Sequence, residues 1–203
     1  MYLVKTPGII QTIFGGLIWK IVKSQKVYLT FDDGPVPEAT PWVLDQLKAK
    51  NVKATFFCVG ENVKKYPEIY QRVLDEGHAV GNHTYNHLNA WKTNYTEYQQ
   101  NVEDAAKWVD SSLFRPPYGR LSPGLIRSLK NKYNIVMWDV LSGDFDTSIS
   151  AQECLTNVKD NAKEGSIIVF HDSIKAIDKL RFVLPSVISF FEEKGMEMDK
   201  IKL

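Results

Sequence analysis

Short apolar runs alternate with longer segments of helical spacing along the chain, and this alternation is the feature that most constrains its fold. Residues 54–59 (ATFFCV) and 166–170 (SIIVF) are typical of buried strands, whereas residues 67–77 carry apolar side chains at helical intervals. Repeated strand–helix units favour a parallel sheet, because each helix returns the chain to the starting end of the next strand. Strands are expected at 27–31, 54–59, 79–82, 113–115, 135–138 and 166–170, with 196–203 as a closing strand and helices at 40–50, 67–77, 95–110, 122–132, 150–163 and 177–194.

Polar clusters follow most of these expected strands. Asp32-Asp33 comes after the first, His83 after the third, Arg115 after the fourth and His171 after the sixth. The carboxyl ends of barrel strands meet on one face, whereas in an open doubly wound sheet they are spread along an edge. The spacing leaves both α/β architectures open, and the strand-end clusters favour a distorted (β/α) barrel of about seven parallel strands. A length of 203 residues with 44% hydrophobic content fits a single domain.

The overall composition excludes function classes that depend on a global electrostatic field. There are 25 Lys and Arg residues against 24 Asp and Glu, for a net charge of +1, so neither nucleic acid nor an anionic membrane is an expected partner. The two cysteines, Cys58 and Cys154, form no CxxC pair. Buried free thiols are the favoured interpretation, and a disulfide between them is the alternative.

Residues 1–25 are interpreted as an amphipathic segment packed on a domain that spans residues 26–203. Residues 7–22 are apolar but contain Gln11 and Lys20, and the run is shorter than the ~20 residues of a membrane span. No small-residue cleavage site follows it, so neither a signal peptide nor a membrane span is predicted, and a cytoplasmic location is the default expectation. An anchor at a membrane surface is the alternative interpretation.

Histidine is used sparingly, and three of the four histidines lie at the expected strand ends. His83 and His87 form an H-x-x-x-H pair, whose imidazoles would share one side of a helical turn. Asp32 and Asp33 precede Gly34-Pro35, and a turn there lets one carboxylate reach a metal ion while the other takes up a proton. Two imidazoles and one carboxylate make up a ligand set typical of catalytic zinc. Taken alone, each pattern is also compatible with a helix cap or a polar turn.

Five segments of the chain together carry a family resemblance. They are residues 30–35 (TFDDGP), 83–87 (HTYNH), 115–119 (RPPYG), 138–145 (WDVLSGDF) and 166–172 (SIIVFHD). In this order they resemble the motifs of the polysaccharide deacetylases, carbohydrate esterase family 4, and the resemblance covers about residues 26–203. It implies a distorted (β/α) barrel that binds a divalent metal ion, most commonly Zn²⁺, with Co²⁺ or another divalent ion as alternatives. It implies no obligate protein partner.

The resemblance also implies a role for each matching residue. Asp33, His83 and His87 correspond to the metal ligands, and Asp32 corresponds to the general base that activates water. Arg115 corresponds to the arginine that holds this base, because a neighbouring cation keeps a carboxylate ionised and oriented.

The remaining matches concern the oxyanion and the leaving group. The backbone N–H of Tyr118 corresponds to the donor that stabilises the oxyanion. His171 corresponds to the general acid that protonates the departing amine, and Asp144 to the carboxylate that orients this imidazole. His78, the fourth histidine, is predicted to be structural and hydrogen-bonded.

An N-acetylated sugar, such as a chitin oligomer or peptidoglycan, is the implied substrate, and removal of its acetyl group is the implied reaction. Phe145 and Val169 stand where the family often has tryptophan and leucine in the acetyl pocket, so both are predicted substrate contacts, together with Tyr118 and Trp91. These two departures motivate a second hypothesis, in which the substrate is a small linear or cyclic amide that is not a sugar. A third hypothesis is a carbohydrate-binding module without catalysis.

Overall fold

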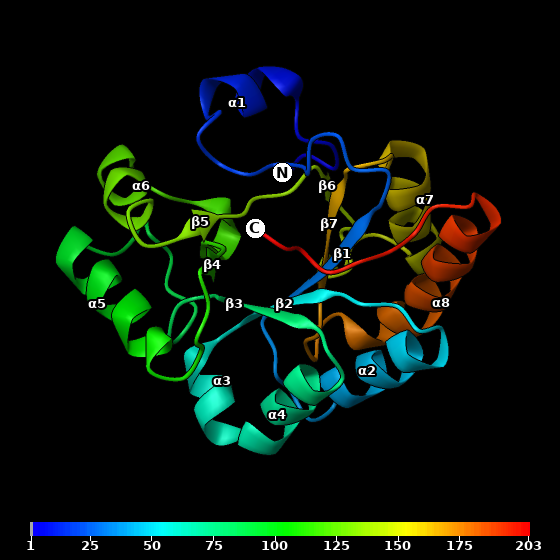
Figure 1. Ribbon diagram of the computed structural model, residues 1–203, viewed down its shortest axis with the longest axis horizontal. Coiled ribbons are helices and arrows are strands. Elements are labelled where there is room, and N and C mark those ends of the chain that lie inside the picture. The colour runs from blue at the N-terminus through cyan, green and yellow to red at the C-terminus, as the bar shows by residue number, and fades with distance from the viewer. Residues whose placement is uncertain (1) are drawn as a thin grey trace.

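Seven parallel strands form one strongly curved sheet in the computed structural model, which describes residues 2–203 (Figure 1). The strand order is β5-β4-β3-β2-β1-β7-β6, so β5 and β6 are the two edges. The sheet curls into a half-barrel within a single domain, which confirms the predicted distorted barrel of parallel strands. The strands are β1 (Tyr28–Asp32), β2 (Thr55–Cys58), β3 (Ala79–Asn82), β4 (Leu113–Phe114), β5 (Asn134–Ile135), β6 (Val140–Leu141) and β7 (Ile167–His171).

Side chains alternate between the two faces of the central strands, because successive residues of a strand point in opposite directions. In β1, Leu29 and Phe31 pack into the main core under the helices, which leaves Thr30 and Asp32 on the inner face. The parallel register pairs Thr30 with Val169 and Asp32 with His171 of β7. Chemically active side chains of two neighbouring strands therefore lie side by side inside the half-barrel.

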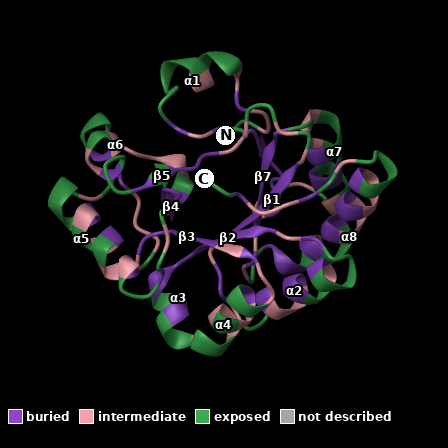
Figure 2. Cartoon of the chain, in the orientation of Figure 1, coloured by how far each residue is buried: buried purple, intermediate pink, exposed green. Residues whose placement is uncertain are grey.

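Helices cover the outer face of the sheet, and their buried sides give the main core (Figure 2). That core is formed by apolar residues of α2, α7 and α8 against β1, β2 and β7. A second cluster packs α5 and α6 on β4 and β5. The helices are α1 (Gly8–Ile13), α2 (Thr40–Ala49), α3 (Gly60–Lys65), α4 (Pro67–Asp75), α5 (Tyr95–Ala106), α6 (Pro123–Leu129), α7 (Ala151–Asn161) and α8 (Ile177–Glu193), with a 3₁₀ turn η1 (Pro117–Gly119) after β4.

The N-terminal segment occupies the gap between the two sheet edges, where Figure 1 shows α1 between α6 and α7. On the β5 side, the Ile18 N–H donates to the Ile135 carbonyl at 2.9 Å, and the Met137 N–H donates to the Ile18 carbonyl at 2.7 Å. On the β6 side, the Leu141 N–H donates to the Val4 carbonyl at 2.8 Å. The segment thus supplies backbone partners to both edges of the half-barrel.

The Asp139 side chain anchors this segment through hydrogen bonds. Its buried carboxylate accepts hydrogen bonds from Lys5 Nζ at 2.6 Å, Gln11 Nε2 at 3.1 Å and Ser166 Oγ at 2.6 Å. A buried carboxylate is tolerated only when it is paired and hydrogen-bonded, and these three donors meet that condition. The acid between β5 and β6 is therefore an anchor for residues far away in the sequence.

Several local expectations differ from the structure. Residues 135–138 do not form one strand: β5 ends at Ile135, and Val136 forms a bridge with Ile18 of the N-terminal segment, before β6 begins at Val140. The closing strand expected at 196–203 is reduced to a single bridge between Val27 and Met198. Helix α3 was not predicted, because its six residues bury only one side chain, that of Val63, and carry little periodicity.

The expectations for the cysteines and for His78 are confirmed. Cys58 and Cys154 are buried free thiols. His78 is buried and structural, because its Nδ1 atom accepts a hydrogen bond from the Ala54 N–H at 3.1 Å, and burial lowers its pKa to about 4. Within residues 2–203, none of the helices is both long and apolar enough to cross a membrane.

Candidate active site

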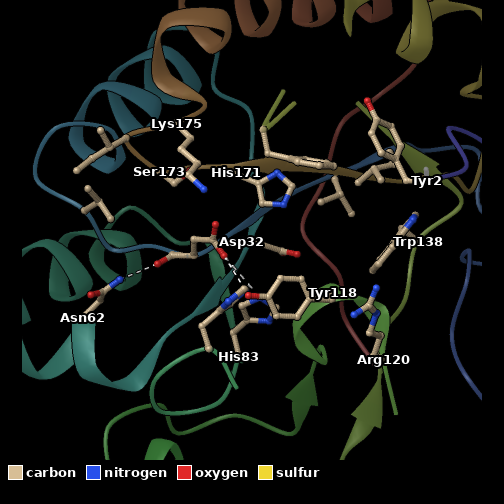
Figure 3. A pocket seen from close by; sticks show the side chains of 17 residues that line it. Tyr2, Asp32, Asn62, His83, Tyr118, Arg120, Trp138, His171, Ser173 and Lys175 are labelled. Carbon is tan, nitrogen blue, oxygen red and sulfur yellow. Dashed lines mark hydrogen bonds and ion pairs between the residues drawn. The ribbon is translucent and has the colours of Figure 1, made fainter. Parts of the chain in front are cut away.

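The carboxyl ends of the strands open into a cavity of about 670 Å³, which Figure 3 shows from close by. Asp32, Asp33, His83, His87 and His171 all line it, although they come from three separate strand ends. The predicted strand-end clusters are thus brought together on one face of the half-barrel, as parallel strands of a barrel allow.

Asp33, His83 and His87 form one cluster at this cavity. The Asp33 Oδ1 atom lies 3.2 Å from His87 Nε2 and 3.8 Å from His83 Nε2, and one ligand atom from each residue lies within 4.8 Å of the others. Two ligands of a tetrahedral ion with bonds of about 2.0–2.1 Å are about 3.3 Å apart, which these separations approach. Asp33 Oδ1 is moreover buried without a hydrogen-bond partner within the described chain, so the cluster fits a divalent cation.

Hydrogen bonding prepares His83 for this role. Its Nδ1 atom lies 2.7 Å from the Arg115 carbonyl oxygen, and because a carbonyl only accepts, Nδ1 must carry the proton. The lone pair of Nε2 then faces Asp33 and is free to bind a metal ion. Burial lowers the pKa of His83 to about 4, so the imidazole is neutral at physiological pH.

The loop that carries both histidines is not the helical turn that the H-x-x-x-H spacing predicted. Thr84 and His87 have φ values of 65° and 59°, in the left-handed region, which a right-handed helix does not permit. The Asn82 side chain accepts from the Thr84 N–H at 2.9 Å, and the Thr84 hydroxyl accepts from the Leu88 N–H at 3.2 Å. Side-chain hydrogen bonds to the backbone therefore give this loop its shape.

Asp32 is held by a fully buried arginine. Arg115 donates from Nη1 to Asp32 Oδ1 and to the Thr30 hydroxyl, both at 2.7 Å. Its other nitrogens donate to the carbonyls of Val136 at 3.2 Å and Met137 at 3.0 Å. The planar guanidinium group thus joins three strand ends and fixes the carboxylate that faces the cavity.

His171 and Asp144 form a second acid–base pair across the cavity. His171 Nδ1 lies 2.8 Å from Asp144 Oδ1, and the His171 backbone N–H donates to Asp144 Oδ2 at 2.7 Å. Burial alone would lower the pKa of His171, but the Asp144 carboxylate, aided by Asp33 and Asp32, raises it to about 9. The imidazole is consequently protonated at neutral pH and can donate a proton.

Of the four predicted substrate contacts, three line the cavity and one does not. Phe145 and Val169 line the cavity, and the Phe145 ring packs on His171 with centroids 5.0 Å apart. Tyr118 also lines it, with its ring 4.7 Å from that of His87. Trp91 is outside the set of lining residues and is 68% exposed, with the Arg120 guanidinium stacked over it at 4.7 Å.

Sequence reasoning overlooked residues that support the site. The buried Asp172 carboxylate accepts from the Gly34 N–H at 3.1 Å and from the Thr40 hydroxyl at 2.6 Å, directly beneath the Asp32-Asp33 turn. A Cβ atom at Gly34 would lie 2.0 Å from Asp172, so the close approach requires glycine. Asp172 lies inside the fifth motif, where a polar residue after a catalytic histidine was the available signal.

Comparison with known proteins agrees with this geometry. The family model described as polysaccharide deacetylase matches residues 20–137, more than half of the chain. The chain belongs to the polysaccharide deacetylase family. This is the family that the five motifs predicted, and the polysaccharide deacetylase is accordingly a hydrolase of carbon–nitrogen bonds.

Relatives of this polysaccharide deacetylase cover most of its length. A peptidoglycan-N-acetylglucosamine deacetylase of Bacillus cereus is 38% identical, and the match covers 83% of this chain and 70% of the relative. A chitooligosaccharide deacetylase of Azorhizobium caulinodans is 34% identical, over 75% of this chain and 77% of the relative. The crystal structure of the Bc1960 peptidoglycan N-acetylglucosamine deacetylase matches with a TM-score of 0.83 and 32% identity, over 97% of this chain and 95% of that one.

Proposed function

We propose that this polysaccharide deacetylase removes acetyl groups from the N-acetylated sugars of peptidoglycan or chito-oligosaccharides, with a divalent metal ion, Zn²⁺ by preference, at Asp33, His83 and His87. The observation that carries the proposal is that this cluster shares its cavity with a carboxylate on one side and a protonated imidazole on the other. Asp32 lies beside the cluster as a proton acceptor, and protonated His171 lies within the same cavity as a proton donor. Amide hydrolysis needs both groups, because water must lose a proton and the amine must gain one.

The metal site supports this reading through its chemistry. Asp33, His83 and His87 would hold a divalent ion, which would supply polarisation of the amide carbonyl and a lower pKa for the attacking water. Neutral His83 and the carboxylate of Asp33, whose pKa the imidazoles of His87, His171 and His83 lower despite its burial, are the forms that bind a cation.

The chain's own residues then divide the reaction. Asp32 accepts the proton of the water whose oxygen bonds to the acetyl carbon, and Arg115 holds that carboxylate in position. The backbone N–H of Tyr118, at the cavity, is proposed to stabilise the oxyanion. His171 gives its proton to the sugar nitrogen as the C–N bond breaks, so that acetate and a free amine leave, and Asp144 holds the imidazole in place.

The test is release of acetate from chito-oligosaccharides and from peptidoglycan fragments, measured with added Zn²⁺ or Co²⁺. We expect release to stop with a chelator and in Asp32→Asn, which keeps the shape of the side chain but cannot accept the proton. Asp178→Asn, an exposed acid in the first turn of α8, is the matched control and should retain activity. Absence of metal-dependent release from every acetylated glycan would refute the proposal.

The same assay separates the two other hypotheses. Phe145 and Val169, the two departures from the family pattern that motivate a small non-sugar amide as substrate, both line the cavity. Ureides and cyclic imides are therefore offered beside the glycans. Turnover of these compounds alone would replace the proposed substrate. Tight glycan binding by calorimetry without turnover would instead support a binding module.

A further inference from the structure

An apolar wall lies beside His171 on the side of the cavity where Figure 3 shows Tyr2 and Trp138. Leu141 of β6 and Val169 of β7 are register partners, so their side chains stand next to each other on this wall. Phe145 closes it toward His171. We name these three residues, Leu141, Phe145 and Val169, the acyl wall, after the part of the proposed substrate that we assign to it below.

Tyr2 extends the acyl wall from the opposite end of the sequence. Its ring packs on that of Phe145 with centroids 5.1 Å apart, and Phe145 in turn contacts the His171 ring. Tyr2 also lines the cavity directly. Neighbouring Leu3 is 53% exposed.

Residues 2–6, the N-terminal strap, reach this position through defined contacts. Lys5 forms an antiparallel bridge with Val140, which places Tyr2 level with Gly143 by register. Lys5 Nζ also bonds to the buried Asp139 at 2.6 Å and to the Asn161 carbonyl at 2.7 Å. The strap is therefore held by both backbone and side-chain bonds.

The loop before Phe145 is shaped to accept the tyrosine. Gly143 has a φ of +82°, and a Cβ atom there would lie 2.8 Å from the Tyr2 hydroxyl. Burial and the neighbouring Asp146 carboxylate raise the pKa of Tyr2, so the phenol stays neutral. The missing side chain at Gly143 leaves room for the phenol end of Tyr2.

We propose that Tyr2 is a specificity-determining residue that closes the acyl wall and restricts the acyl group that is hydrolysed from the sugar nitrogen to the size of acetyl. The inference rests on the proposed function, because it assigns the acyl end of that reaction to this wall. Removing the ring opens the wall outward and gives longer acyl chains apolar surface to contact. One methylene more or less in an apolar pocket changes discrimination by about 10–200-fold.

The test compares glucosamine oligomers that carry acetyl, propionyl or butyryl groups on nitrogen. In Tyr2→Ala, we expect the ratio of kcat/KM for butyryl over acetyl substrate to rise at least about tenfold. Tyr2→Phe keeps the ring and should stay within about twofold of the wild-type ratio. Leu3→Ala changes the adjacent, exposed strap residue and is the matched control.

A merely structural role for Tyr2 gives a different result. If the ring only supports Phe145 against His171, Tyr2→Ala would lower kcat/KM for all three substrates equally and leave their ratio at the value of Leu3→Ala. That outcome would overturn the proposal. Tyr2→Leu, which shortens the side chain but keeps apolar packing, tests the same ratio should the alanine variant unfold.

Binding of hydroxamates separates this inference from the proposed function, because it needs no turnover. Acetohydroxamate and butyrohydroxamate are titrated calorimetrically into the zinc-loaded protein. We expect Tyr2→Ala to lower the Kd of butyrohydroxamate relative to that of acetohydroxamate. Leu3→Ala should leave the ratio of the two Kd values unchanged. A shift in this ratio without acetate release from any glycan would refute the proposed function alone, whereas an unchanged ratio would refute the role of Tyr2.

Discussion

Replacement of Arg115 by methionine should cost stability as well as activity, because the charge of this arginine is compensated only inside the protein. Methionine retains the apolar stem of the side chain but removes the guanidinium group, whose carbon lies 4.0 Å from the centroid of the Phe57 ring. It removes the positive charge beside Asp32 and the donors to the Thr30 hydroxyl and to two buried carbonyls. The variant therefore isolates the polar contribution.

The expected magnitude follows from what is left behind. Breaking a buried ion pair by removing one partner typically costs about 3–5 kcal/mol, because the other charge stays buried without compensation. With an m-value of about 2 kcal/mol per molar urea, Arg115→Met should lower the unfolding midpoint by about 1.5–2.5 M. Arg115→Lys keeps a charge near Asp32 but cannot span the carbonyls of Val136 and Met137, so we expect an intermediate loss of about 1–3 kcal/mol.

Urea unfolding at pH 7 of the metal-free protein, followed by circular dichroism, gives these free energies. A double variant, Arg115→Met with Asp32→Asn, removes the orphaned charge and should recover part of the loss. If Arg115→Met unfolds within about 1 kcal/mol of the wild type, the ion pair does not stabilise the fold as argued. A double variant less stable than Arg115→Met would equally contradict the explanation by an uncompensated charge.

Three further predictions concern pH, metal and the support of the turn. The Asp144 carboxylate raises the pKa of His171 to about 9, so activity should fall as pH rises through that value. In Asp144→Asn, the alkaline limb of the pH–kcat profile should move to lower pH. A limb that does not move would exclude His171 as the general acid. Added Zn²⁺ at about 100 times its Kd should stabilise the fold by about 2.7 kcal/mol and raise Tm by roughly 5–10 °C in a thermal scan, with no shift in His83→Ala. Burial raises the pKa of Asp172 to about 8, so the unfolded state loses this proton at a lower pH than the folded state, and the free energy of unfolding declines between about pH 4 and 8. Asp172→Asn should remove that decline and be more stable than the wild type at pH 8.5 by at least about 1.4 kcal/mol, the equivalent of one pKa unit. Equal urea midpoints of the two proteins at pH 8.5 would contradict this prediction.

The site residues that could be predicted from the sequence are those whose chemistry is unusual for their position. Two acids directly after an apolar strand, or a histidine at a strand end, violate the expected pattern of a buried sheet, and they predicted most of the site. The alternation of strands and helices predicted a parallel sheet, and the polar clusters at the strand ends favoured a barrel over an open sheet. Arg115 was predicted through its motif to hold Asp32, but its bonds to the carbonyls of Val136 and Met137 were not, because every residue type presents a backbone carbonyl equally.

Local backbone conformation was the other source of error. The H-x-x-x-H pair is compatible with a helix by spacing, but Thr84 and His87 adopt left-handed φ values that spacing does not reveal. Tyr2 was overlooked for a different reason: its partner Phe145 lies far along the chain, so no periodicity links them. Contacts of this kind become visible only when the strand order is known.

The position of the N-terminal segment has a consequence for the order of folding. Residues 2–20 are synthesised before the residues that they contact, since Ile18 bonds to Ile135, Lys5 to Asp139, and Tyr2 packs on Phe145. Contacts this distant in sequence are slow to form, and during translation the partners do not yet exist. This segment must therefore wait until residues 135–145 have left the ribosome, and the gap of the half-barrel is closed by residues that were made before their partners.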